Sequence, residues 1–358
     1  MKTTFTLDAE LSATEPPERR GLARDEVRLL VATEHGIRHR RFRELPAVLA
    51  PGDLVVANDS DTEPAAVEGV RADGRRVTLH VSGPARVTPG AYVVELRDPV
   101  QGRVSDARRG ERVLLPHGVV ATLLDAHPDP AVDIGSRLWL AAIPVAGGLR
   151  AWLQVAGHPI RYSYVRGEHP LADHRTIFAR PDGGSAGGFA SAEMPSAGRP
   201  FSTRVLAGLA VAGIGLATLT LHTGVASLEA GETPLPERYR VPAATAAAVN
   251  ATRAAGGRIV AVGTTVTRAL ETVAEPDGSV RAGSGWTDLV LGPGRRARTV
   301  DGLVTGWHEP DASHLLLLEA VAGRALVERA YEAALAARYL WHEFGDTCVL
   351  LPGERHDD

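Results

Sequence analysis

One stretch, residues 256–288, constrains the fold of this 358-residue chain more than any other. Ile259–Val262 is an apolar, largely β-branched run that ends in Gly263-Thr264-Thr265 and passes into a helical pattern containing Arg268. That order predicts a strand, a tight turn and a helix. Such a turn places hydroxyls and free backbone N–H groups at the carboxyl end of a strand, where open α/β sheets bind ligands. The stretch therefore predicts an α/β sheet with a ligand site, although a Gly-Thr turn alone also suits a structural role.

Strands and helices alternate in the sequence after residue 200. Ser202 predicts a helix N-cap, and that helix should end at Gly213. The nearly continuous apolar run from Ile214 to His222 is typical of a buried parallel strand. Further helices are predicted after Pro242 and over 315–322 and 324–340, and further strands over 286–291 and 347–351, with a loop through His308. Because this alternation favours parallel pairing, the fold class is predicted as α/β with a mostly parallel sheet.

The region from residue 63 to 160 has a different pattern. Short β-type runs recur between turn signals, at 77–81, 92–96, 113–115, 119–124 and 138–143. Many short strands with little helical period predict a small barrel. Before this region come a probable hairpin over 27–42 and a short buried strand over 54–57. We therefore predict a discontinuous α/β domain, residues 1–62 and 161–358, that carries an inserted β-barrel domain, residues 63–160. The Gly-rich run 182–188 predicts a mobile loop or a linker.

Composition excludes several classes of chemistry. Lys2 is the only lysine, which excludes a P-loop lysine, a lysine Schiff base and a Ser-Lys dyad within the fold. The single Cys348 excludes an intramolecular disulfide and a Cys-cluster metal site. No metal-ligand spacing appears, so we expect no metal. No apolar run is long enough to span a bilayer and no charged-then-apolar leader opens the chain, so a cytoplasmic protein is expected.

Motifs spread along the chain resemble those of a known family. They are the Gly263-Thr264-Thr265 turn with Arg268, the run 283–288, Arg28-Leu29-Leu30-Val31, the block 51–59, Thr220-Leu221-His222 and Gly345-Asp346. Nearly end to end, the chain resembles the S-adenosylmethionine:tRNA ribosyltransferase-isomerase family. The resemblance implies an α/β domain with an inserted β-barrel, which agrees with the pattern described above.

The resemblance also implies a reaction. Enzymes of this family transfer and isomerise the ribosyl part of S-adenosylmethionine onto 7-aminomethyl-7-deazaguanine at the wobble position of tRNA. The product is epoxyqueuosine, and adenine and methionine are released. S-adenosylmethionine is then a consumed substrate, no prosthetic group is needed, and tRNA carrying the modified base is the partner.

The chain departs from the family pattern at several motifs. Asp61 stands where the family has arginine, and Asp311 stands where it has lysine. Two family histidines are replaced, by Pro200 and by Leu235. These changes remove cations that would contact a polyanion and imidazoles that would transfer protons. The net charge of −4 adds no general attraction for nucleic acid. Two arginine-rich runs, 38–43 and 295–298, could touch RNA phosphates or could be solvated faces.

The reaction needs a base beside the sulfonium, a proton donor for adenine, and groups that hold the ribose. The retained catalytic candidates are Asp59, His222, Glu237, Asp288, His308 and Asp346. The substrate-binding candidates are Asn58, Gly263, Thr264, Thr265, Arg268, Gly283, Ser284, Gly285, Trp286 and Thr287. Trp286 could face a purine or attract a sulfonium. Each has a structural alternative: a satisfied core histidine, a turn cap, a salt-bridge partner or a packing tryptophan.

Three functions remain open from the sequence. The first is the family's own reaction on modified tRNA. The second is the same donor chemistry on a different, small acceptor, which the lost basic positions favour. The third is a protein that binds S-adenosylmethionine or RNA without turnover. A basic surface beside the pocket would favour the first, a closed acidic mouth the second, and candidates that point away from one another the third.

Overall fold

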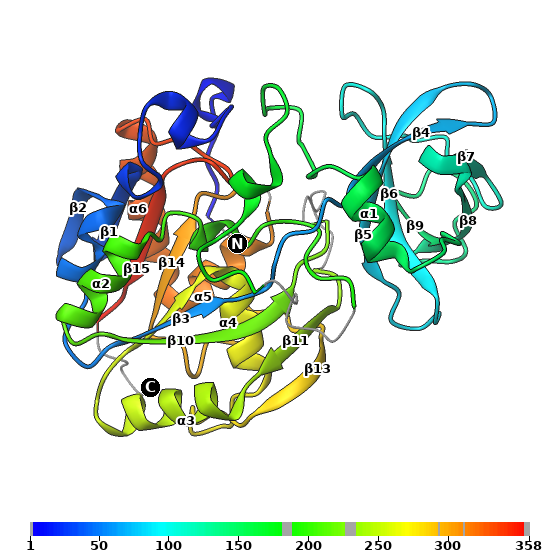
Figure 1. Ribbon diagram of the computed structural model, residues 1–358. Coiled ribbons are helices and arrows are strands. Elements are labelled where there is room, and N and C mark those ends of the chain that lie inside the picture. The colour runs from blue at the N-terminus through cyan, green and yellow to red at the C-terminus, as the bar shows by residue number, and fades with distance from the viewer. Residues whose placement is uncertain (1–2, 181–187, 226–233, 293, 311, 354–358) are drawn as a thin grey trace.

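The computed structural model describes residues 3–180, 188–225, 234–292, 294–310 and 312–353. It has two lobes (Figure 1), a large α/β lobe and a smaller β-barrel lobe joined to it by extended segments. Most of the predicted Gly-rich loop, residues 182–187, lies outside the described residues. The α/β fold class with an inserted barrel is confirmed.

Nine strands form the large sheet, in the order β13-β11-β10-β3-β12-β14-β15-β1-β2. Their bounds are β1 Arg28–Thr33, β2 Gly36–Arg41, β3 Leu54–Asn58, β10 Gly215–His222, β11 Glu237–Val241, β12 Ile259–Val262, β13 Gly283–Thr287, β14 Gly302–Gly306 and β15 Thr347–Leu351. The pairs β10–β3, β3–β12, β12–β14 and β1–β15 are parallel, and the other pairs are antiparallel. The sheet is therefore mixed rather than mostly parallel, although four adjacent central strands are parallel.

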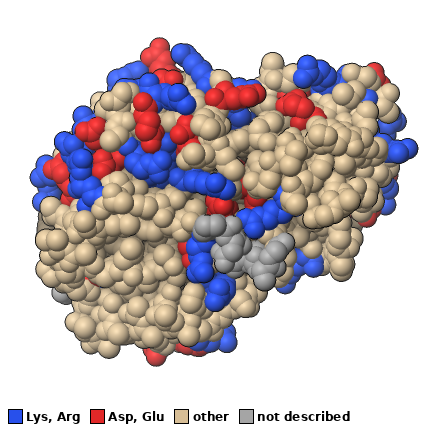
Figure 2. Space-filling view, in the orientation of Figure 1, with Lys and Arg blue, Asp and Glu red and all other residues tan. Residues whose placement is uncertain are grey.

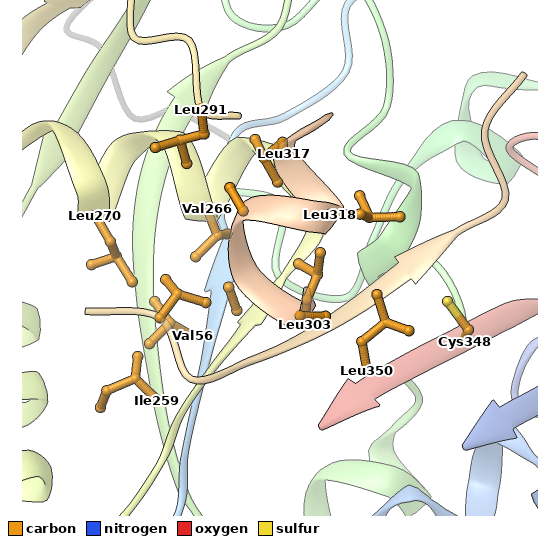
Figure 3. Close-up of a cluster of buried hydrophobic side chains, with 14 of the residues drawn as sticks. Val56, Ile259, Val266, Leu270, Leu291, Leu303, Leu317, Leu318, Cys348 and Leu350 are labelled. Carbon is orange, nitrogen blue, oxygen red and sulfur yellow. The ribbon is translucent and has the colours of Figure 1, made fainter. Parts of the chain in front are cut away.

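Alternate residues of the central strands pack into two different cores. Val56, Ile259 and Leu303 belong to the larger core, which Figure 3 shows together with Leu270 and Leu318 from the covering helices. That face is covered by α3 Ala243–Ala254, α4 Gly263–Thr272, α5 His314–Ala322 and α6 Arg324–Ala336. The opposite face carries a smaller core against α2 Thr203–Val211 and the 3₁₀ segment Phe42–Ala47. Both faces of the strands are thus buried, which explains their continuous apolar runs.

The smaller lobe is a closed barrel with the strand order β4-β5-β6-β9-β8-β7. The bounds are β4 Ala66–Arg71, β5 Arg76–Pro84, β6 Ala91–Arg97, β7 Arg112–Leu114, β8 Val120–His127 and β9 Leu138–Ala142. Helix α1, Leu149–Ala156, follows the last strand and contributes Leu149 and Leu153 to the barrel core. All six strands fall between residues 63 and 160, the range predicted for the insertion.

Three strands were not predicted from the sequence: β4, β11 and β14. The run 302–306 has a glycine at each end and only three residues between, which gives little periodic signal, yet it is central in the sheet. The strand expected over 286–291 is wrong in position, because β13 covers 283–287. The helix expected over 324–340 ends at Ala336. The Ser202 cap is confirmed, since its side chain accepts a hydrogen bond from the Val205 backbone at 3.3 Å.

Candidate functional site

The four parallel central strands end at the same edge of the sheet. His222 is the last residue of β10, Asn58 is the last of β3, and Gly263 follows β12 directly. His308 comes two residues after β14. Because parallel strands place their carboxyl ends together, sequence segments that lie far apart converge here.

The turn after β12 is as tight as its sequence predicts. Gly263 has φ of 88°, a region that favours glycine, and helix α4 begins at this residue. A Cβ at this position would also lie 3.3 Å from the Cβ of Ala197. Thr264 and Thr265 consequently stand at the N-terminus of α4, where backbone N–H groups and the helix dipole favour an anionic or polar ligand group.

A cavity of about 610 Å³ opens at this edge, between the sheet and the barrel. Eight of the predicted site residues line it: His222, Glu237, Gly263, Thr264, Thr265, Arg268, Trp286 and His308. The barrel contributes Ser82, Arg97 and His127 to the same lining. The two lobes thus build one site.

Arg268 holds one wall of the cavity together. Its guanidinium forms a salt bridge with the mostly buried Glu237 and donates to the backbone carbonyls of Leu289 at 3.1 Å, Leu235 at 3.2 Å and Thr287 at 3.3 Å. Burial raises the pKa of Glu237, and the charge of Arg268 opposes that rise. The ion pair therefore holds the Glu237 carboxylate in place at the cavity, and the positive charge of Arg268 compensates most of the carboxylate's negative charge.

The histidines in the cavity are neutral. Burial, with a smaller contribution from Arg238 and Arg150, lowers the pKa of His222 to about 3. Burial lowers the pKa of His308 well below its usual value, and the neighbouring His314 and His342 act in the same direction. A neutral imidazole can accept a proton and does not repel a cationic ligand as an imidazolium would.

Both predicted histidines have defined partners. His222 Nδ1 lies 2.8 Å from Ser60 Oγ, and Ser60 Oγ lies 2.7 Å from Ser191 Oγ. His308 Nε2 lies 3.0 Å from Thr305 Oγ1, and the ring stacks on His314 with centroids 4.7 Å apart. These contacts orient each ring at the cavity wall.

Among the described residues, three predicted catalytic acids do not line the cavity. Asp288 is 76% exposed and faces Arg86, with a nitrogen–oxygen distance of 3.7 Å. Asp346 is buried and accepts hydrogen bonds from the Arg28 and Leu340 backbones, so it fixes the β1–β15 region. Asp59 is buried beneath β10 and accepts from Thr218 and Thr220. Each carboxylate has a structural partner where the sequence suggested chemistry.

Several predicted substrate-binding residues have hydrogen-bond partners within the fold or lie outside the cavity lining. Asn58 donates to the Leu221 carbonyl at 2.8 Å and to Thr265 Oγ1 at 3.3 Å, which ties β3 to β10 and α4. Thr287 Oγ1 lies 2.6 Å from Thr272 Oγ1. Gly283, Ser284 and Gly285 form the edge strand β13, and within the described lining only Trp286 of that strand reaches the cavity.

The lining contains a column of three aromatic rings that was not predicted from the sequence. Tyr164 stacks on His342 with centroids 3.9 Å apart and on Tyr162 at 5.8 Å. The Tyr164 hydroxyl donates to Glu343 at 2.7 Å, and that of Tyr162 donates to Glu193. No motif joins these positions, because residues 162–164, 193 and 342–343 meet only in the fold.

Three histidines that were not predicted from the sequence also lie in the cavity lining. His174, His314 and His342 line the cavity although no motif identified them. Burial lowers the pKa of each to about 4. The described part of the chain holds no group of three or more His, Cys, Asp or Glu residues arranged to bind a metal ion. Within the same residues, no helix has the length and apolar character needed to cross a membrane.

Fold and cavity together define a two-domain α/β protein with an inserted β-barrel, whose site at the sheet edge suits a polar, ring-containing ligand. The chain belongs to the queuosine biosynthesis protein family, whose pattern matches residues 2–350. Curated relatives named S-adenosylmethionine:tRNA ribosyltransferase-isomerase include those of Symbiobacterium thermophilum and Acidiphilium cryptum. Each is 36% identical over 97% of this chain, covering 98% and 97% of the relative, respectively.

A solved structure agrees with this assignment. The S-adenosylmethionine tRNA ribosyltransferase of Thermotoga maritima is 27% identical and superposes with a TM-score of 0.52. The match covers 98% of this chain and 99% of that chain.

Proposed function

We propose that this protein transfers and isomerises the ribosyl part of S-adenosylmethionine onto 7-aminomethyl-7-deazaguanine in tRNA, giving epoxyqueuosine, adenine and methionine. S-adenosylmethionine is consumed as a substrate and no prosthetic group takes part. The observation that carries the proposal is the convergence of eight predicted site residues on one cavity at the sheet edge. Full-length similarity to relatives that bear this enzyme name supports it.

The cavity residues divide naturally among the tasks of this reaction. The imidazoles of His222 and His308 lie in the cavity lining, where one of them would accept the proton beside the sulfonium. The N-terminus of α4, with Thr264 and Thr265, suits a carboxylate or ribose hydroxyls. The Trp286 ring suits adenine or the sulfonium. Because their pKa values are low, the cavity histidines are neutral and do not repel the positive charge of S-adenosylmethionine.

The second candidate function, the same donor with a small acceptor, is favoured by the acidic substitution at position 61. Against it, partly exposed arginines lie beside the cavity, among them Arg86 and Arg175. The third candidate, binding without turnover, is disfavoured because the retained histidines and Glu237 line one cavity instead of pointing apart. The tRNA reaction is therefore the function that the geometry supports best.

The test is release of adenine and methionine from S-adenosylmethionine by the purified protein. We expect release to require tRNA that bears 7-aminomethyl-7-deazaguanine and to be absent with tRNA that lacks it. His222→Asn should lower kcat about 100-fold or more if His222 is the base. Release that is triggered only by another acceptor would favour the second function, and binding without any cleavage would favour the third.

A further inference from the structure

An extended segment, residues 58–63, runs beside the cavity, and Thr62 belongs to the cavity lining. The Asp59 backbone donates to Leu219 at 2.9 Å, and Thr62 forms a parallel bridge with Ser191, so the segment continues in an extended form beyond β3. Side chains of an extended segment alternate between two sides. On one side, Ser60 contacts His222, and Thr62 lines the cavity.

The other side of the same segment carries three acids, and each is paired with an arginine. Asp59 Oδ2 lies 3.8 Å from Arg180. Asp61 accepts two hydrogen bonds from Arg175, at 2.7 and 2.9 Å. Glu63 lies 2.6 Å from Arg150 of helix α1. We refer to Arg150, Arg175 and Arg180 as the arginine row.

Burial is unequal within these pairs. The three acids are almost completely buried, whereas the side chains of the arginine row are 25%, 42% and 52% exposed in the order given. The carboxylates therefore lie beneath the guanidinium groups. Arg175 uses Nε and Nη2 on Asp61, which leaves Nη1 for another partner. An arginine held in this way has already lost most of its rotamer freedom, so binding through it costs less entropy.

A second hollow lies beside Arg150 and Arg175 of the arginine row. Its described lining includes Arg150, Arg175 and Arg238, and Asp61 is the one acid in it. Pro84 and Arg238 line both this hollow and the cavity, so the two adjoin. Figure 2 shows basic side chains gathered along the seam between the two lobes. By contrast, the arginine-rich run 38–43 lies mostly on the edge strand β2, at the far end of the sheet from the barrel (Figure 1).

We propose that the arginine row binds the sugar–phosphate backbone of the RNA acceptor, so that the nucleotide to be modified passes to the cavity on the other side of segment 58–63. This inference rests on the proposed function. Alternate residues of an extended chain are roughly 6.5 Å apart, comparable to the length of one nucleotide of an extended strand. The planar guanidinium group of arginine can donate two parallel hydrogen bonds to phosphate oxygens. A phosphate on the solvent side of the arginine row is nearer to the guanidinium groups than to the carboxylates beneath them.

The test removes one pair without changing the net charge. Arg175→Gln alone would lower the net charge and leave the Asp61 carboxylate to repel a phosphate, so the double variant Arg175→Gln/Asp61→Asn is used. We expect its affinity for an anticodon stem-loop RNA to fall about threefold to tenfold at 0.1 M salt. We also expect the slope of log affinity against log salt to become shallower by about 0.7–0.9, the contribution of one phosphate contact. Fluorescence anisotropy from 50 to 300 mM salt measures both.

The matched control is Arg324→Gln/Glu328→Gln on α6. This pair is also partly exposed and hydrogen-bonded, at 2.7 Å, and its removal also preserves net charge. It should leave RNA affinity and salt slope unchanged. Asp61→Asn alone keeps the Arg175 charge but loosens its position, so it should weaken binding while retaining most of the slope. Thermal unfolding of each variant verifies folding.

The outcomes separate this inference from the proposed function. An unchanged salt slope in the Arg175/Asp61 variant overturns the inference, whether or not the wild type releases adenine. Wild-type protein that does not bind the stem-loop, or that binds polyglutamate equally well, also overturns it. Salt-sensitive RNA binding that is lost in the variant, together with no cleavage of S-adenosylmethionine by the wild type, supports the arginine row and refutes the proposed function.

Discussion

The titratable groups on the two sides of segment 58–63 differ in how far they are exposed to solvent and in how their charges are compensated. On the cavity side, His222 is kept neutral by burial, and Glu237 is compensated by Arg268. On the other side, the arginines are paired with buried acids but remain partly exposed. The difference follows from solvent, because a buried charge must be neutralised or fully paired whereas a hydrated charge need not be. One short segment thus separates a site suited to chemistry from a surface suited to a polyanion.

The largest expected effect tests the buried side of this comparison. Arg268→Met leaves Glu237 buried without its partner, and we expect the free energy of unfolding to fall by about 3–5 kcal/mol. Arg175→Gln should cost only about 1 kcal/mol, because water can reach Asp61 once the exposed guanidinium is gone. Urea denaturation of both variants measures the difference. Equal losses of unfolding free energy in the two variants would show that the cavity side and the arginine-row side of segment 58–63 do not differ in solvation.

The double variant Arg268→Met/Glu237→Gln provides the control for that experiment. Removal of both charges should restore most of the stability. If it does not, the hydrogen bonds from Arg268 to backbone carbonyls carry the stability instead of the ion pair.

An intermediate effect is expected from pH. The pKa values of His174, His314 and His342 are lowered to about 4 and that of His222 to about 3, whereas histidine in an unfolded chain titrates near 6.5. Between pH 6.5 and about 4, the unfolded chain therefore binds protons that the native state does not. As the pH falls from 6.5 to about 4, each such histidine should lower the free energy of unfolding by about 1.4 kcal/mol per pH unit. Above pH 6.5, these histidines should not contribute to the pH dependence of stability.

The measurement is urea denaturation at pH 7, 6 and 5. His314→Asn/His342→Asn should make the pH dependence shallower. A double variant that retains the full wild-type slope would contradict the view that burial keeps the cavity imidazoles neutral.

The smallest effect is expected at Asp288. Its exposed carboxylate lies outside the cavity lining and faces Arg86. Asp288→Asn should change stability by no more than about 0.5 kcal/mol, as for most surface substitutions, and should leave adenine release unchanged. A large loss of kcat would return Asp288 to the catalytic candidates and would require the 288 region to move towards the cavity.

A structural feature could be predicted from the sequence where all the residues that cause it lie in one short segment. The Gly263 turn needs a residue that tolerates φ of 88°, and the sequence alone identifies it. The Ser202 cap and all the barrel strands except β4 follow in the same way. The strand β14 and the edge strand β13 were missed or misplaced because their stability comes from neighbouring strands and not from their own residues.

The site residues divide along the same line. Thr264, Arg268 and His222 were predicted because they lie at, or one turn beyond, strand ends that the hydrophobic pattern reveals. Asp59 and Asp346 share that sequence signal, yet backbone and hydroxyl donors from distant segments use their carboxylates for structure.

The sequence by itself determined the α/β class with its inserted barrel, the glycine turn, and the exclusion of lysine and disulfide chemistry. Only the tertiary structure decided which residues meet. It placed Tyr162, Tyr164 and His342 in one column, and it set Arg175 over Asp61, where the sequence indicated only a lost cation. The physical reason is that burial and ion pairing depend on distances between segments far apart in the chain, and local sequence carries no information on those distances.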